Sequence, residues 1–327
     1  MSFSRRVKEE LVQQLCEARH CLIAEFAAIF ALIGKIKQSK VHGVSLQIQT
    51  ENLTVAKKSY ILLRKTFQVQ VEVRVRSHHT KVSGVNYLLI VREDEDIRRI
   101  LEAVKVLDVQ TNQWGDLHTI HPLVVQNTCC KRSYLRGTFL VAGSITNPEK
   151  AYHLEMAVPS EQYALQLKEL MSAFSLEGKI VMRKKNYVLY LKEGAQIVDF
   201  LNVIEAHMAL MELENVRIVK EVRNSVNRQV NCETANISKT VTAAAKQIED
   251  IKYLQCKMGF SRLTDALREV AELRLDYPDS SLQELGQMLE NPISKSGVNH
   301  RLRKISEIAE QLRGKDCSLE LKEDMKE

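Results

Sequence analysis

Polar side chains suited to reading DNA gather in one short segment near the C-terminal end of the chain. No Asp or Glu occurs between Ser294 and Lys304. An Asn side chain can pair bidentately with adenine and an Arg side chain with guanine, whereas Lys and Arg charges neutralise phosphates without reading bases. The predicted base-reading residues are Ser296, Asn299, His300 and Arg303, and the predicted phosphate contacts are Lys295, Arg301 and Lys304.

A helix predicted from Lys295 to about Leu312 would carry these side chains on its outer face. Apolar residues recur along it at intervals of 4, 3, 4 and 3, which gives the helix one buried stripe. The stripe consists of Val298, Leu302, Ile305, Ala309 and Leu312. Ser294 is the expected N-terminal cap of this helix.

A second, shorter helix is predicted just before it, over 282–289. Ser281 can cap this helix, and Gly286 permits close approach of the helix that follows. The pair forms a helix-turn-helix motif from Ser281 to Arg313, with a turn slightly longer than the tightest form. A basic outer face is also typical of an ordinary solvated helix. The caps, the turn, the small residue and the stripe together favour DNA binding over that alternative.

The first 210 residues contain one pattern of helices and strands twice. Each copy opens with an apolar helix that ends at a glycine, Gly34 or Gly143, where a left-handed backbone would end the helix. The segments expected to follow are 44–50, 53–67, 69–76, 85–91 and 96–107 in the first copy, and 152–158, 161–174, 179–183, 187–191 and 195–206 in the second. Paired strands between helices indicate antiparallel sheets with helices on one face, an α+β fold class.

Two such units resemble the LAGLIDADG homing endonuclease fold, which implies opening helices packed at a pseudo-twofold axis and sheets that form a saddle over DNA. In that family a metal-binding acid precedes each terminal glycine. Ile33 and Ala142 occupy those positions here, and neither can coordinate Mg²⁺. Glu25 and Glu155 are acids in the wrong positions. We therefore expect no catalytic residues, no metal and no cofactor; the alternative is an active endonuclease that uses displaced acids.

The resemblance also implies a second DNA-facing surface on the predicted sheets. The cations that would line it are Lys35, Lys37, Arg74 and Arg76 in the first copy, and Arg183, Lys184 and Lys185 in the second. Strand-borne cations equally serve to block aggregation at sheet edges. A third interpretation, a protein-docking platform or ligand sensor, stays open for the duplicated half.

The complete order of parts resembles the WhiA family, on the strings Asn-Arg-Gln-Val-Asn-Cys-Glu-Thr-Ala-Asn-Ile-Ser-Lys-Thr at 227–240 and Ser-Lys-Ser-Gly-Val-Asn-His-Arg-Leu-Arg-Lys at 294–304. The resemblance implies a transcription regulator of cell division and chromosome segregation, and of sporulation in some lineages. Its implied partner is double-stranded DNA, with other transcription proteins as further candidates, in the cytoplasm at the nucleoid. The expected divisions are 1–110 and 111–210 (LAGLIDADG-like units), 211–245 (an ordered polar linker), 246–313 (helix-turn-helix domain) and 314–327 (a disordered charged tail).

Composition and the remaining motifs exclude several other functions. The 327 residues carry a net charge of +6, a mild excess that suits a polyanionic partner. No secretory signal, membrane-length apolar stretch or nucleotide-binding glycine motif occurs. Seven cysteines without a CxxC pair indicate reduced thiols; Cys129 and Cys130 are either packed residues or a redox pair. Asp116, His118 and His121 are expected in a loop rather than at a metal.

Overall fold

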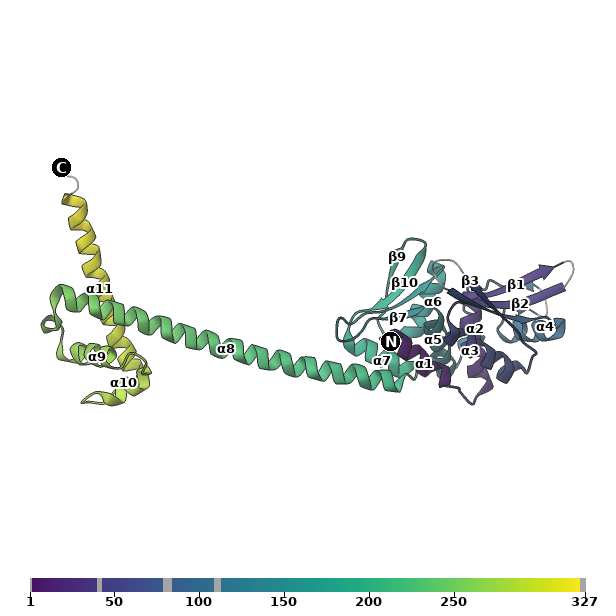
Figure 1. Ribbon diagram of the computed structural model, residues 1–327, viewed down its shortest axis with the longest axis horizontal. Helices are drawn as coiled ribbons and strands as arrows, with labels where there is room; N and C mark the ends of the chain where they lie inside the picture. Colours follow the sequence, from purple (N-terminus) through teal and green to yellow (C-terminus); the bar gives the residue numbers. More distant parts are fainter. Residues whose placement is uncertain (1, 40–42, 79–83, 109–112, 324–327) are drawn as a thin grey trace. The chain divides into compact units, whose positions relative to one another are not determined.

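The computed structural model describes residues 2–39, 43–78, 84–108 and 113–323, in two compact units, 1–221 and 222–327 (Figure 1). Unit 1 contains two four-stranded antiparallel sheets with the same strand order, so the predicted α+β class and duplication are confirmed. The first sheet runs β1 (Gly34–Ser39), β2 (Gly43–Thr50), β4 (Gly84–Val91) and β3 (Glu72–His78). The second runs β7 (Gly143–Ile145), β8 (Leu154–Val158), β10 (Asn186–Leu191) and β9 (Lys179–Arg183).

Helices cover one face of each sheet because that face is apolar. Leu46 and Ile48 on β2, and Leu154 and Met156 on β8, are fully buried. The helices of unit 1 are α1 (Phe3–Gln13), α2 (Arg19–Ile33), α3 (Leu53–Leu62), α4 (Asp94–Ala103), α5 (Thr128–Ala142), α6 (Glu161–Ser172) and α7 (Gly194–Val203). Shorter pieces are a π-helical turn (Leu63–Phe67), a 3₁₀ turn (Pro122–Val125) and the two-residue strands β5 (Leu107–Asp108) and β6 (Gln113–Trp114).

The opening helices α2 and α5 pack against each other at the centre of unit 1, as the duplication predicts. Gly137 lies at their crossing, where an added Cβ would sit 2.4 Å from the backbone oxygen of Glu25. A side chain there would push the two backbones apart, so only glycine permits this contact. Figure 1 shows the strands of both sheets on one side of this helix pair.

Gly34 and Gly143 end α2 and α5 as predicted, but the expected left-handed conformation is wrong. Both are extended, with φ of −74° and −78°. Glycine is required there for space, since a Cβ would lie 2.2 Å from the ring of Phe30 or Phe139. Each helix therefore passes directly into the first strand of its sheet, α2 into β1 and α5 into β7, with the glycine packed against the Phe30 or Phe139 ring.

A buried ion-pair network joins the two copies. Glu25 on α2 accepts from Lys58 Nζ at 2.9 Å and from Arg136 Nε on α5 at 3.1 Å, and Arg136 also pairs with Glu205. Lys58 donates further to the backbone oxygens of Leu11 and Gln14. Burial lowers the pKa of Lys58, which Glu25 partly offsets; burial also acts to lower the pKa of Arg136, but Glu25 and Glu205 raise it. Three buried charges thus satisfy one another in the core, and the partly exposed Glu205 adds a fourth at its edge.

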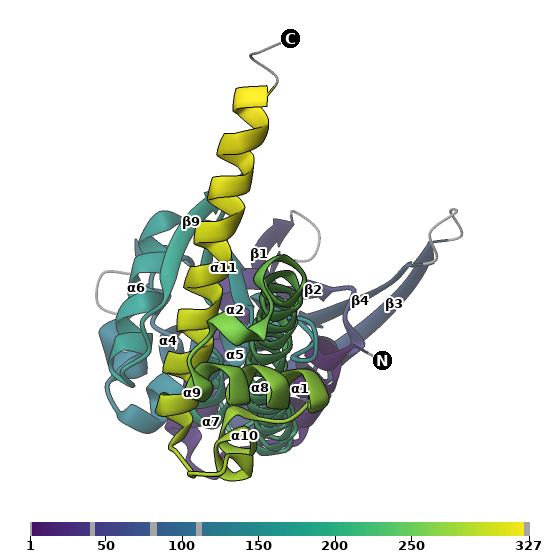
Figure 2. The same cartoon turned by 90° about the vertical axis from the view of Figure 1, so that its left-hand side faces the viewer.

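The described part of unit 2, residues 222–323, contains helices and no strand, as the second half of the predicted fold class requires. Its core residues come from the end of α8 (His207–Met258), α9 (Asp265–Asp276), α10 (Leu282–Met288) and α11 (Lys295–Glu323), with a 3₁₀ turn (Phe260–Arg262) after α8. Figure 2 looks along α8 and shows α11 lengthwise. Gly259 ends α8 with φ +69°, a left-handed value that suits glycine. Across the described ranges, no helix is both long and apolar enough to cross a membrane.

Two predicted segments lie within longer helices. Residues 211–245, expected as an ordered polar linker, lie within α8, which is one continuous helix. We expected α11 to end near Leu312 and the tail 314–327 to be disordered, but α11 continues to Glu323. A lone Gly314 costs a helix only about 1 kcal/mol relative to Ala, and Pro is absent from the following residues. Residues 324–327 lie outside the described residues.

Candidate nucleic-acid interface

The second helix of the predicted motif is held in place by its apolar stripe. Val298, Leu302, Ile305 and Ala309 are almost fully buried, and Leu312 is half-buried. Ser294 accepts a hydrogen bond from the backbone nitrogen of Gly297 at 3.3 Å, which caps α11 as expected. The register of this face fixes which side chains of α11 turn outward.

The first helix and the turn show the predicted close packing. Ser281 and Glu284 form a reciprocal capping box at the start of α10. A Cβ on Gly286 would lie 2.4 Å from the backbone oxygen of Ile293, and Gly286 itself accepts a hydrogen bond from Ile293 N at 3.0 Å. The turn therefore folds back onto α10, and this contact is what brings α11 against it.

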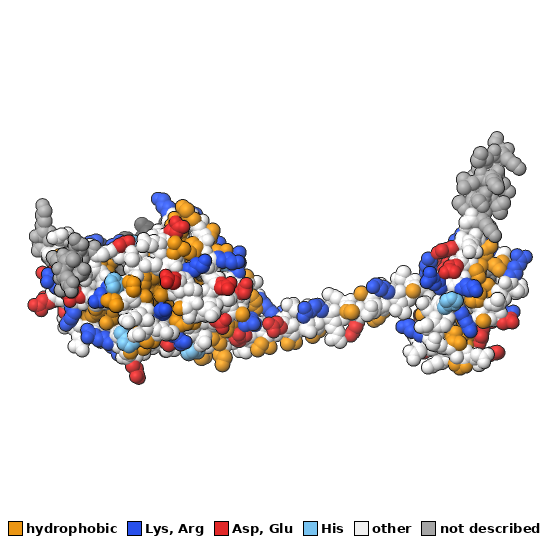
Figure 3. All heavy atoms as spheres, turned by 180° about the vertical axis from the view of Figure 1, so that it is seen from behind, with side chains coloured by type: hydrophobic (Ala, Val, Ile, Leu, Met, Phe, Trp, Pro, Cys, Tyr) orange, Lys and Arg blue, Asp and Glu red, His pale blue; other side chains and the backbone are white. Residues whose placement is uncertain are grey.

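Six of the seven predicted contact residues are exposed on α11. They are Lys295, Ser296, Asn299, His300, Arg303 and Lys304. The Arg303 side chain is 78% exposed, and its guanidinium pairs with Glu307, one turn further on, at 3.2 Å. An exposed pair of this kind is weak and can open for another anion. Figure 3 shows Lys, Arg and His side chains gathered on one face of unit 2.

Arg301 differs from the other predicted contacts. It is half-buried, and its guanidinium donates to the backbone oxygen of Ala266, at the start of α9, at 3.4 Å. Its position on the flank of α11 toward α9 follows from the helical period, since Arg301 lies between the buried stripe and solvent. A role for Arg301 in joining α11 to α9 is therefore visible in the structure, beside the predicted phosphate contact.

A groove of about 400 Å³ lies beside the start of α11, and sequence reasoning did not find it. Lys295 and Asn299 line it together with Lys239 and Gln247 of α8 and Gln283 of α10. Arg274 closes one side, where it donates to the backbone oxygens of Pro278 and Ser280, and burial lowers its pKa. The absence of acids at 234–248 of α8 was the only signal in the sequence.

The sheet cations of the first copy share one face. On β1, Lys35 and Lys37 alternate with Ile36, which packs on the core. On β3, Arg74 and Arg76 lie opposite Leu88 and Asn86 of β4. Val73, between them and Glu72 in sequence, lies opposite the core residue Leu89, so it is Val73 and not the arginines that faces the helices. All four cations therefore lie on the face away from the helices, as a saddle requires. One acid, Glu72, is on this face and pairs with Arg74 and Arg92.

The second sheet is less free to bind an anion. Arg183 at the end of β9 donates to Glu155 on β8 at 3.0 Å, and His153 lies 3.1 Å from the same carboxylate. Lys184 and Lys185 are exposed in the turn that follows. Of the cations predicted for this copy, only Lys184 and Lys185 in the turn are without this acid, because Glu155 already pairs with Arg183.

The two positions where a LAGLIDADG nuclease would need metal-binding acids carry no oxygen-ligand side chains. Ile33 and Ala142 are the last residues of α2 and α5. Glu25, the nearest acid on α2, is fully buried in the ion-pair network, and Glu155 is paired with Arg183 and His153. In the described part of the chain, no group of three Asp, Glu, His or Cys side chains converges at these helix ends. The residues present do not fit a Mg²⁺ site.

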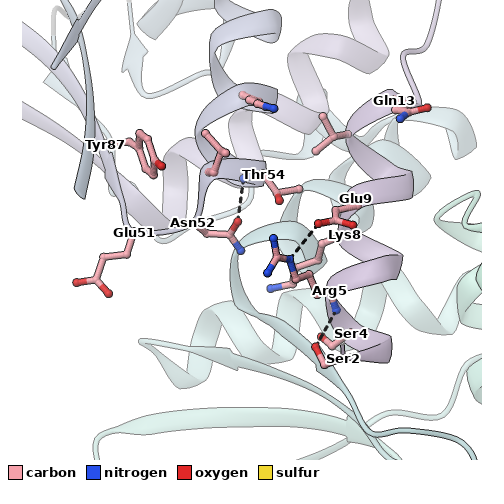
Figure 4. A pocket seen from close by; sticks show the side chains of 13 residues that line it. Ser2, Ser4, Arg5, Lys8, Glu9, Gln13, Glu51, Asn52, Thr54 and Tyr87 are labelled. Carbon is pink, nitrogen blue, oxygen red and sulfur yellow. Dashed lines mark hydrogen bonds and ion pairs between the residues drawn. The ribbon is translucent and has the colours of Figure 1, made fainter. Parts of the chain in front are cut away.

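Two other polar regions have structural roles. Asp116 accepts from the backbone nitrogen of His118 at 2.9 Å, and His121 Nδ1 accepts from Leu123 N at 3.3 Å, so both stabilise turns. A groove of about 920 Å³ lies between α1 and the start of α3 (Figure 4). Within it, Arg5 pairs with Glu9, and Asn52 accepts a hydrogen bond from the backbone nitrogen of Thr54. Burial lowers the pKa of Lys8 in this groove to about 8.

Family models match three parts of the chain. Residues 19–107 match the WhiA N-terminal LAGLIDADG-like domain, 131–223 the WhiA LAGLIDADG-like domain, and 226–309 the WhiA C-terminal HTH domain. A probable cell division protein WhiA of Lachnoclostridium phytofermentans is 51% identical over 96% of this chain and 100% of its own length. The chain belongs to the WhiA family.

Further relatives agree with this assignment. The probable cell division protein WhiA of Alkaliphilus oremlandii is 47% identical, over 95% of this chain and 98% of its own. The crystal structure of full-length DUF199/WhiA from Thermatoga maritima superposes with a TM-score of 0.58 at 26% identity, covering 95% of this chain and 99% of that one. The WhiA resemblance drawn from the sequence is confirmed.

Proposed function

We propose that this WhiA-family protein is a sequence-specific DNA-binding regulator of transcription that does not cut DNA. It would act in cell division and chromosome segregation, and in sporulation in some lineages. The proposal rests above all on α11, whose outer face from Lys295 to Lys304 is exposed, basic and free of acids. Binding to chromosomal DNA would place the protein at the nucleoid, with other transcription proteins as further partners.

The side chains of α11 support two roles, base reading by some residues and phosphate contact by others. Asn299 and Arg303 carry the groups that pair bidentately with adenine and guanine, and Ser296 and His300 lie beside them. Lys295 and Lys304 flank this set as phosphate contacts, to which Arg301 adds if its bond to Ala266 opens. Lys239, across the groove from Asn299, extends the basic surface onto α8.

The proposal that DNA is left intact rests on the ends of α2 and α5. Aliphatic and small side chains, Ile33 and Ala142, stand where a nuclease of this fold needs carboxylates. The neighbouring acids are held in ion pairs. The exposed cations Lys35, Lys37, Arg74 and Arg76 would then serve binding alone.

Selection of bound sequences from a random DNA pool by the full chain tests this function. We expect one enriched motif, and we expect Arg303→Ala to lose preference at one base position of that motif, by about 1–3 kcal/mol. Lys304→Ala is the matched control: it should weaken binding to all sequences alike and lower the salt slope by about 1. Equal weakening of all sequences by Arg303→Ala would make Arg303 a phosphate contact.

The same selected DNA distinguishes a regulator from a nuclease. A supercoiled plasmid that carries the motif is incubated with the full chain and Mg²⁺, with EDTA as the control. We expect the plasmid to stay supercoiled. Mg²⁺-dependent nicking at the motif would show that displaced acids support catalysis and would overturn the proposal.

A further inference from the structure

Four metal-binding side chains converge at the N-terminal ends of α2 and α5. His20 and Cys21 lie in the first turn of α2, and Cys129 and Cys130 lie in the first turn of α5. Their ligand atoms all lie within 4.8 Å of one another. The cluster is therefore assembled from two segments more than 100 residues apart, by the same helix packing that defines unit 1.

The distances suit a tetrahedral ion. His20 Nδ1 lies 3.1 Å from Cys130 Sγ, 3.4 Å from Cys21 Sγ and 4.0 Å from Cys129 Sγ. With Zn–S bonds of about 2.3 Å and a Zn–N bond of about 2.0 Å, tetrahedral angles place nitrogen and sulfur about 3.5 Å apart. The observed separations bracket this value, so small side-chain rotations would bring all four atoms to one centre.

The surroundings favour an ion over mere packing. Cys21 and Cys130 are buried, whereas His20 and Cys129 are exposed, so an ion can enter from the solvent side. Three thiolates, one neutral imidazole and Zn²⁺ carry a net charge of about −1. Both α2 and α5 direct their N-termini at the cluster, and a helix N-terminus stabilises negative charge.

We propose that His20, Cys21, Cys129 and Cys130 bind one structural zinc ion that clamps α2 to α5. Soft thiolate ligands with imidazole select zinc over Mg²⁺, which prefers oxygen. The site lies at the opposite end of these helices from Ile33 and Ala142, about 20 Å away at 1.5 Å per residue. The ion would therefore stabilise the helix pair and take no part in phosphodiester chemistry.

Metal analysis of the untagged full chain, purified under reducing conditions without chelator, tests the site. We expect about one zinc per chain in the wild type and in Cys232→Ser, a matched control because Cys232 is an exposed cysteine of α8. We expect at least a tenfold lower content in the double variant Cys129→Ser with Cys130→Ser. Zinc below a tenth of an equivalent in the wild type, or unchanged in the double variant, would overturn the proposal.

Cobalt titration keeps the test valid if the double variant fails to fold. Co²⁺ added to the metal-free full chain should give the intense thiolate charge-transfer and visible bands of a tetrahedral site, and stoichiometric zinc should abolish them. His20→Ala removes only an exposed side chain, so it should fold and bind Co²⁺ at least tenfold more weakly. Absence of the thiolate bands, or a disulfide among these cysteines in the purified chain, would contradict the proposed site. DNA binding is not needed for either readout.

Discussion

The two units of the molecule use charged side chains in opposite ways. In unit 1 the central charges of Glu25, Lys58 and Arg136 are buried and mutually paired. In unit 2 the α11 cations Lys295, Arg303 and Lys304 are exposed, and Arg303 pairs with the exposed acid Glu307. Buried charges must be matched within the protein, whereas exposed ones are available to a polyanion. The central charges of unit 1 thus specify structure, whereas the exposed cations of α11 are those we propose for recognition.

The largest effect that would test this comparison comes from removing the acid at the centre of unit 1. Glu25→Ala leaves Lys58 and Arg136 without their shared partner in the core, so we expect a loss of about 3–5 kcal/mol in the free energy of unfolding. Urea denaturation of the full chain followed by far-UV circular dichroism measures it. Glu205→Ala, which removes a partly exposed partner of Arg136, should cost much less. Equal losses would show that Glu25 is not the centre of the network.

A smaller effect, confined to binding, is expected in unit 2. Asn299→Ala removes an exposed amide from α11, so the free energy of unfolding should change by less than about 0.5 kcal/mol. Affinity for the selected DNA should fall by about 1–3 kcal/mol if Asn299 reads a base. Fluorescence anisotropy at fixed salt gives the affinity, with Lys168→Ala on α6 as an exposed control far along the chain. If Asn299→Ala lowers the free energy of unfolding as much as the free energy of binding, then Asn299 has a structural role and the contrast between the two units is wrong.

A third effect sharpens the picture of unit 1, where burial shifts the pKa of one half-buried cation. Burial lowers the pKa of Lys8 to about 8 in the folded chain. Between pH 8 and the ordinary lysine value of about 10.4, the unfolded chain binds more protons, so stability rises with pH. Lys8→Met removes this dependence: the variant should be more stable than the wild type at pH 7, by a margin that shrinks as pH approaches 10. Thermal melts at both pH values measure the margin.

Periodic and repeated features were predictable from the sequence, and contacts between distant segments were not. The stripe from Val298 to Ala309 and the strand patterns of both copies confirm the predicted elements, because burial imposes their period. The helix α1 was not predicted, although Phe3, Val7 and Leu11 form its buried face. The groove of Asn299 with Lys239 and the cluster of His20 with Cys130 join residues whose spacing carries no local signal.

The bare backbone contact at Gly137 limits how far the duplicated halves can diverge. A residue larger than glycine there meets the carbonyl of Glu25, and no rotation of a side chain relieves that clash. Each copy therefore constrains which mutations the other tolerates, long after the duplication that created them. The contact between α2 and α5 at Gly137 should therefore vary less among related sequences than the exposed surfaces of the two copies.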